Sequence, residues 1–518
     1  MKARSRSLTF AFASLALAAC VARPAELEPR QMSSSRAAEA ARAGGSPTYG
    51  VLATDATRTL LRSYYNGDGL WRDCPQTQCW VHNSDWGSDS LTNTLYLRWR
   101  TSRDPSVVAI LAALSRTARS YLPPCDGPSC VLWSDAPLWD SVAAAREHEV
   151  DPGNAVALAK AIAAFRAVEG SNVYGLGACP EIRYQRPFGR GNHLKTLETD
   201  SNGVKAALLL YDATHDAQYL QVAVARYDAI RRHFMDPEMS LYSVYVFDDG
   251  RRCVQVPHRF FASVNGNMIW NGIALYHATG DETYRAEALG TARAVTRRLS
   301  DPSGAFMNMQ AENDLAEPLV EAMLVLAAQE HVDFARSWLL ANASAAYSAR
   351  KVDGTYGRFF GGPPPAAAVT AWQTSGGFAS EVAAAALEPG GTPRAAAWQA
   401  AVFVRHAITS LPATIRFVGS GFALIGTIGD VCCEPGHARI IVDNVETMDR
   451  TGAWQNKSSS GRRFPNSVLF ALSWPAGGRH EVTLLPGTYN AKEGGPFLHA
   501  AGYLVQGSGA TTTAPPSR

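Results

Sequence analysis

Apolar side chains between residues 51 and 388 recur at the spacing of amphipathic helices, and turns rich in Gly, Pro or Asp interrupt them. Windows rich in Ala and Leu that end at such turns are typical of helices. The pattern predicts helices at 51–65, 90–101, 104–121, 137–149, 153–168, 200–214, 216–234, 264–279, 281–299, 312–330, 332–346 and 373–387.

An internal repeat supports this assignment. The segment at 211–219 recurs at 276–284, and each copy carries an Asp, at 216 or 281, that is placed to cap the following helix. Asp151 stands in the same position one repeat earlier. Each unit is therefore a helical hairpin, and stacked hairpins bury what one hairpin leaves exposed.

The connections between these helices alternate in length. Those near 102, 151, 215, 280 and 331 are short, whereas the long ones span 66–89, 122–136, 169–199, 235–263, 300–311 and 347–372. In an up-and-down array, alternate connections lie at the same end, so the long ones share one face. Twelve helices with this asymmetry predict an (α/α)6 barrel, and long structured connections usually carry function.

The pattern changes after the breaker at 388–393. From about 412 to 507, short β-branched and aromatic runs alternate with Gly, Pro and Asn turns, as in an antiparallel β-sandwich. We therefore predict a multidomain chain, α then β. Its parts are a barrel at 49–388, a linker at 389–411, a sandwich at 412–507 and a disordered polar tail at 508–518.

The amino terminus has the layout of a secretory signal. Basic residues precede an apolar run at 8–19 that is too short to span a bilayer. The run ends in Leu-Ala-Ala-Cys20, which resembles the bacterial lipobox and implies a signal peptide at 1–20 with lipid attachment at Cys20. The alternative is an ordinary signal peptide cut near Ala19. Residues 21–48 have the composition of a flexible tether.

These features predict an exported, lipid-anchored protein of the cell envelope. The residue after the cysteine is Val21 rather than Asp. In the usual sorting pattern of bacteria with two membranes, this favours the outer membrane. A net charge of +2 without basic runs argues against nucleic acid as a partner, and a polysaccharide or oligosaccharide fits this neutral balance. We expect a monomer without cofactor. We also expect no metal site, because the His residues lack metal-ligand spacing.

Cysteine usage agrees with export. Eight cysteines remain after Cys20, an even number that suits disulfides in an oxidising compartment. Cys179 and Cys253 lie in two different long connections and are candidates to link them. Local bridges are also plausible for the pairs at 74/79 and 125/130. A zinc site is the alternative, but paired CxxC motifs and nearby His are missing.

We call the end of the barrel with the long connections the long-connection face; every second helix, which we call an inner helix, begins there. Acidic, amide and indole side chains gather at the starts of these inner helices. Carboxylates between aromatic rings suit glycosidic bond cleavage, in which one acid protonates the leaving oxygen and another attacks or activates water. Taken singly, each acid is better explained as an ordinary helix cap, and the clustering on one face is what favours a catalytic role. The catalytic candidates are Asp135, Asp200 and Asp314, and the substrate-binding candidates are Trp86, Trp133, Trp139, Glu198, Asn265, Asn267, Trp270, Glu312 and Gln373.

Part of this pattern resembles a known family. The segments at 133–143, 200–203, 265–276 and 372–375 are similar to motifs of glycoside hydrolase family 76, the endo-α-1,6-mannanases. The resemblance covers roughly 90–388 and implies a retaining glycosidase on α-mannan-like polymers, with two adjacent aspartates as nucleophile and acid/base.

This sequence departs from that motif. Asp135 matches the first aspartate, which places Ala136 at the second; a shift by one residue places Ser134 at the first instead. One carboxylate is therefore absent in either alignment. Candidates for a substitute acid are Asp140, Asp200, Glu312 and Asp314.

The β region is similar to galactose-binding-like sandwiches appended to carbohydrate enzymes, at 417–426, 442–444 and 480–484. This resemblance implies glycan contact, and a purely structural sandwich is the alternative. Trp454 and Trp474 are its candidate stacking residues.

The sequence thus supports a cell-envelope glycoside hydrolase that acts on an α-linked polysaccharide, with Asp135 as the retained carboxylate. The alternative is a surface glycan-binding lipoprotein that has lost catalysis. A third possibility is sugar epimerisation or polyuronide lysis. Either reaction would need His or Tyr bases at the long-connection face, and the sequence shows no such group of residues there.

Overall fold

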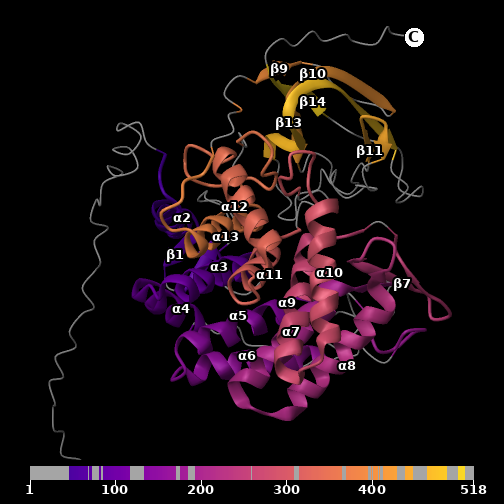
Figure 1. Ribbon diagram of the computed structural model, residues 1–518. Coiled ribbons are helices and arrows are strands. Elements are labelled where there is room, and N and C mark those ends of the chain that lie inside the picture. The colour runs from indigo at the N-terminus through magenta and orange to yellow at the C-terminus, as the bar shows by residue number, and fades with distance from the viewer. Residues whose placement is uncertain are drawn as a thin grey trace, which may run out of the picture. The chain divides into compact units, whose positions relative to one another are not determined.

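The computed structural model describes residues 46–67, 69–72, 81–82, 86–116, 133–170, 176–184, 193–257, 259–307, 314–364, 369–394, 398, 401–405, 408, 412–428, 438–446, 464–486 and 500–507. Its helical part has all the helices predicted from the sequence (Figure 1). They are α2 (Tyr49–Tyr64), α3 (Trp86–Ser102), α4 (Pro105–Arg116), α5 (Ala136–Val150), α6 (Ala155–Glu169), α7 (Leu197–Thr214), α8 (Ala217–Phe234), α9 (Ala262–Thr279), α10 (Glu282–Arg298), α11 (Glu317–Ala328), α12 (Asp333–Ser348) and α13 (Ala371–Leu387).

The odd-numbered helices form a closed inner ring. Each of α3, α5, α7, α9 and α11 contacts the next odd-numbered helix, and α13 packs back against α3. The inner helices are buried on nearly all sides in their amino-terminal parts, whereas outer helices such as α8 and α10 bury only a stripe. This arrangement confirms the predicted (α/α)6 barrel.

Helix caps explain the sharp turns of the short connections. The Asp216 carboxylate accepts the Gln218 amide at 2.9 Å, and Asp281 accepts that of Thr283 at 2.9 Å, as predicted. The prediction for Asp151 is wrong. Pro152 and Gly153 lengthen that turn, so Asn154 caps α6 instead.

The long connections contain short strands that link one connection to another. β4 (Leu194–Thr196) pairs with β7 (Tyr245–Asp248), and β7 pairs with β8 (Cys253–Gln255), so the α6–α7 and α8–α9 connections share one sheet. This pairing agrees with the expectation that the long connections lie at the same end. The remaining short strands are β1 (Tyr65–Gly67), β2 (Leu70–Arg72), β3 (Val81–His82), β5 (Met235–Asp236) and β6 (Leu241–Tyr242).

The carboxyl-terminal part is an antiparallel six-stranded sheet in the order β12-β11-β13-β10-β14-β9. Its long strands β10 and β13 change register between Gly419 and Gly421, where the ladder is interrupted by a bulge. β9 lies inside the segment predicted as linker, so the sheet begins earlier than expected. The strands are β9 (Val402–Val404), β10 (Ala413–Ile428), β11 (Ala438–Val442), β12 (Val445–Glu446), β13 (Phe464–Pro486) and β14 (Ala500–Gln506).

Two long connections of the barrel contact this sheet. Asp301, after α10, accepts hydrogen bonds from the Ser473 amide at 2.9 Å and hydroxyl at 2.6 Å. Phe359, before α13, packs in the apolar core of the sheet together with Met307. The sheet therefore contacts connections that belong to the long-connection face.

In the part of the chain that the structure describes, no helix combines the length and the apolar character that a membrane crossing needs. The signal sequence, Cys20, the cysteine pairs at 74/79 and 125/130 and Trp454 lie outside the described residues.

Candidate functional site

Three acidic residues lie at the long-connection face, each at or just before the start of a different inner helix. Asp135 directly precedes α5, Glu198 is in the first turn of α7, and Asp314 precedes α11. The negative charges of Asp135 and Asp314 both raise the pKa of the Glu198 carboxyl, so each of the two lies near enough to Glu198 to interact with it. We call these residues the acidic cluster.

The surroundings of Glu198 favour its protonated form. Burial is the main cause that raises its pKa well above the ordinary value, and the neighbouring carboxylates add to it. The Thr196 hydroxyl, 3.4 Å from the Glu198 carboxylate, opposes the shift only in part. Because Glu198 remains partly accessible, it has the properties of a general acid.

Asp314 connects the acidic cluster to the start of α9. Its two carboxylate oxygens accept the Ala262 amide at 2.8 Å and the Ser263 amide at 3.0 Å. Burial raises the pKa of Asp314 to about 6 although these hydrogen bonds lower it. Asp314 is therefore a helix cap whose charge acts on Glu198.

Asp135 occupies the N-cap position of α5 without capping the helix through its side chain. It is only 8% exposed. The adjacent Ser134 hydroxyl lies 2.6 Å from the Thr199 hydroxyl and donates to the Tyr184 carbonyl at 2.9 Å. These bonds join the segments that carry Asp135 and Glu198.

Asp200 lies elsewhere than expected for a catalytic group. It is fully buried, and its carboxylate accepts the Arg183 guanidinium at 2.8 Å and the Arg183 amide at 3.0 Å. Arg183 also pairs with Glu169 at the end of α6. The geometry gives Asp200 the task of holding the 176–184 segment against α7.

The predicted amide residues are engaged inside the barrel. Asn265 accepts the Tyr242 amide at 2.9 Å and donates to the Tyr242 carbonyl at 3.0 Å, which fixes β6 on α9. Asn267 donates to Asn202 at 3.0 Å and accepts from the Lys205 ammonium at 3.2 Å. Gln373 accepts the Thr370 amide in a capping box at the start of α13.

The predicted indoles differ in exposure. Trp133, next to the acidic cluster in sequence, is 41% exposed, whereas Trp139 and Trp270 are buried at 4% and 8%. Trp86 packs against Trp372 with ring centroids 4.7 Å apart. Trp133 is therefore the best placed of them to meet a ligand, and Glu312 lies outside the described residues.

A buried ionic network in the barrel was not foreseen. Glu321 pairs with Arg146 and, at 2.7 Å, with Lys205, which also lies over the Trp270 ring at 5.0 Å. Arg146 and Lys205 hold the pKa of the Glu321 carboxyl down to about 2. Charged residues in the otherwise apolar stretches of inner helices were the signal that could have revealed it.

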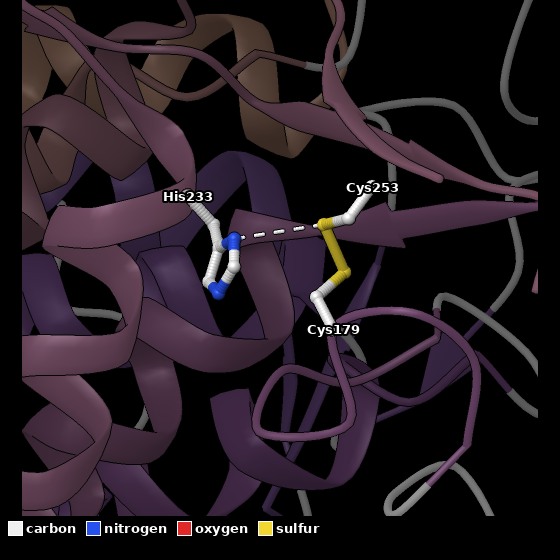
Figure 2. Close-up of side chains that lie close together, drawn as sticks. All are labelled: Cys179, His233 and Cys253. Atoms are coloured by element: carbon white, nitrogen blue, oxygen red, sulfur yellow. Dashed lines mark hydrogen bonds between the residues drawn. A yellow bond between two sulfur atoms is a disulfide. The ribbon is translucent and has the colours of Figure 1, made fainter. Parts of the chain in front are cut away.

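The predicted link between Cys179 and Cys253 is confirmed. The two residues form a disulfide with a Cα–Cα distance of 5.8 Å, which ties the α6–α7 connection to β8 (Figure 2). The His233 ring lies beside it, with Nδ1 3.5 Å from Cys253 Sγ and Nε2 2.6 Å from a Glu181 oxygen. The disulfide thus fastens the segment that contains Arg183 and Tyr184.

At the level of sequence, no protein-family model matches this chain, and neither does any curated protein. Solved structures do match. The α-1,6-mannanase of glycoside hydrolase family 76 from Salegentibacter sp. HEL1_6 matches with a TM-score of 0.57 at 18% identity, covering 66% of this chain and 100% of that chain.

Two further structures show the same fold. An inactive variant of the Salegentibacter enzyme, with two consecutive aspartates replaced by asparagine and α-1,6-mannotriose bound, has a TM-score of 0.56 at 18% identity and covers 65% of this chain and 99% of that chain. The family 76 α-mannanase of Bacteroides thetaiotaomicron has a TM-score of 0.55 at 15% identity and covers 68% of this chain and 98% of that chain. The helical part of this chain therefore has the barrel fold of these enzymes.

Proposed function

We propose that the barrel is a glycoside hydrolase that cleaves an α-linked, mannan-like polysaccharide at the acidic cluster. The observation that carries this proposal is the convergence of Asp135, Glu198 and Asp314 from three inner-helix entrances. The likeness to α-1,6-mannanase barrels supports it. In one of those enzymes, the replacement of two consecutive aspartates yields an inactive variant that is seen with mannotriose.

In this proposal Glu198 takes the place of the acid that Ala136 cannot provide. The protonated Glu198 donates its proton to the glycosidic oxygen as the bond to the anomeric carbon breaks. Asp135 attacks that carbon or removes a proton from the attacking water. Two carboxyl groups with different environments suit these two tasks, since one must be protonated while the other is ionised.

The surroundings suit a polysaccharide chain. The exposed Trp133 ring offers an apolar face for a sugar ring beside Asp135. The Ser134–Thr199 hydrogen bond and the Arg183–Asp200 pair keep the two carboxyl-bearing segments in place. Rigid support of this kind is what positioned acid–base groups require.

The test is hydrolysis of linear α-1,6-mannan by the purified chain, with released oligosaccharides measured by chromatography. Asp135→Asn and Glu198→Gln should each lower kcat/KM by about 10²- to 10⁴-fold. Glu238→Gln, a change at an exposed acid outside the acidic cluster, is the matched control and should leave the rate unchanged. Full activity of both cluster variants would refute the assignment.

A second candidate is a surface glycan-binding protein without catalysis, which Ala136 favours because the adjacent acid is absent. The same mannan separates the two candidates. Binding of the polymer without release of oligosaccharide would establish the second, and release would establish the first.

We also propose that the chain is exported and anchored in the cell envelope by a lipid on Cys20, facing its glycan at the outer membrane. Metabolic labelling with radioactive palmitate in a bacterial host tests this proposal. Label should enter the expressed protein and be absent from Cys20→Ser, and a wild-type protein without label would refute the proposal.

A further inference from the structure

The carboxyl-terminal sheet carries a hollow of about 510 Å³ that lies apart from the acidic cluster. It opens where β11 ends, beside the paired segments of β10 and β13 in which Arg416 faces Glu481 and Phe417 faces His480. The volume falls in the range of about 300–1,000 Å³ that is usual for small-molecule sites.

The rings of Phe417 and His480 form part of one wall of this hollow, and both contact Trp474. The His480 ring stacks on Trp474 with centroids 4.1 Å apart and an interplanar angle of 25°, and Phe417 meets Trp474 edge-on. Asp443 fixes both rings, because one of its oxygens lies 2.9 Å from His480 Nδ1 and accepts from Trp474 Nε1 at 3.3 Å. The wall is therefore organised before any ligand arrives.

The carboxylate groups that line the hollow already accept hydrogen bonds from other groups of the protein. Asp443 uses its other oxygen for the Glu481 amide at 2.8 Å, and the Glu481 carboxylate accepts Arg416 at 2.6 Å. Arg479, by contrast, is exposed and makes no ion pair or side-chain hydrogen bond with any residue that the structure describes. Its guanidinium offers donors in a geometry that matches carboxylates and phosphates.

We propose that this hollow binds a sugar unit that carries an oxyanion, with Arg479 as the principal charged contact. A flat ring wall suits the apolar face of a pyranose, and the uncommitted guanidinium suits a carboxylate or phosphate substituent. This site would hold an acidic glycan independently of the chemistry in the barrel. It goes beyond the proposed hydrolase and does not depend on it.

Calorimetric titration of the full chain tests the proposal. The probes are a trimer of galacturonic acid, mannose 6-phosphate, neutral α-1,6-mannotriose and inorganic phosphate. We expect saturable binding of at least one acidic sugar, weakened about 10- to 100-fold in Arg479→Gln. Arg405→Gln, at an exposed arginine of the same region outside the hollow, is the matched control and should bind as wild type.

Whether the site prefers a carboxylate or a phosphate follows from which of the two acidic sugars binds more tightly. Equal binding by Arg479→Gln, equal affinity for neutral mannotriose, binding of inorganic phosphate alone, or no binding of either acidic sugar would each overturn the proposal. Repeating the titration with Asp135→Asn separates it from the barrel, because affinity in the hollow should not change even if mannan hydrolysis is lost.

Discussion

Glu198 is largely buried and interacts with the charges of two other carboxyl groups, and both effects favour its neutral form. Its neighbour Asp314 is tied to two backbone amides of α9, which keeps that negative charge in a fixed place. At the scale of single residues, the proposed acid–base chemistry therefore depends on charges that helix ends hold in place.

Asp314→Asn tests this electrostatic coupling. Removing the negative charge should lower the pKa of Glu198, so the alkaline limb of the kcat/KM profile should move to lower pH. The effect should appear above about pH 6, where wild-type Asp314 is ionised. The profile of Asp236→Asn, which alters a turn outside the acidic cluster, should match wild type; an unmoved limb in Asp314→Asn would contradict the coupling.

The sequence pattern predicted these positions but not all their tasks. Asp135, Glu198 and Asp314 were predicted at the mouth because each stands where an inner helix begins. Asp200 stands there too, yet it points to Arg183, a residue far from any helix start. Which neighbour a carboxylate meets depends on tertiary packing, and periodicity carries no information about that.

At the scale of elements, the inner helices approach each other through small residues. A Cβ added to Gly266 in α9 would lie 2.4 Å from the Leu319 backbone nitrogen in α11. Added to Gly290 in α10, a Cβ meets nothing within 4 Å. The same substitution should thus have opposite effects at the two sites.

Gly266→Ala should lower the free energy of unfolding by at least about 1–3 kcal/mol, because two backbones would have to separate. Gly290→Ala should raise it by about 0.5–1 kcal/mol through helix propensity. Urea denaturation followed by circular dichroism measures both. Equal shifts would show that the α9–α11 contact is looser than described.

The disulfide between Cys179 and Cys253 ties the α6–α7 connection to β8. Cys179→Ser with Cys253→Ser should cost about 2–4 kcal/mol of unfolding free energy. It should also lower mannan hydrolysis, because the released segment includes Arg183 and Tyr184, which hold α7 and Ser134. Denaturant unfolding and the hydrolysis assay check the two effects, and unchanged values in both would contradict this role.

At the scale of the whole molecule, several carboxyl groups are buried with raised pKa values. Burial raises the pKa of Glu381 in α13 to about 8, against the opposing effect of Arg350. The folded state then binds a proton that the unfolded state has released between its ordinary pKa of 4.5 and about 8. Stability from this group is therefore lost as pH rises through that window.

Glu381→Gln removes this dependence. The variant should match wild type near pH 4.5 and exceed it above pH 8 by on the order of a few kcal/mol. Thermal unfolding at several pH values measures the difference, with the exposed Glu282→Gln in α10 as control. The account would be contradicted if wild type lost no stability relative to Glu381→Gln between pH 4.5 and pH 8. The carboxyl group would then ionise in the folded state with little loss of free energy of unfolding.

The barrel was predictable because the alternation of short and long connections determines at which end of the barrel each of the twelve helices begins. The sheet was predictable only as a class, since the register shifts between β10 and β13 and the pairing of β9 with β14 depend on contacts between residues far apart in the sequence. The hollow beside Arg479 was not predicted, because it forms where β11 stops short of its neighbour.

The most direct test of the central claim is a crystal structure of the Asp135→Asn variant soaked with α-1,6-mannotetraose. We predict an oligosaccharide across the acidic cluster, with the Glu198 carboxyl about 2.6–3.2 Å from a glycosidic oxygen. A tetrasaccharide bound away from Glu198, or none bound at the barrel mouth, would contradict the claim.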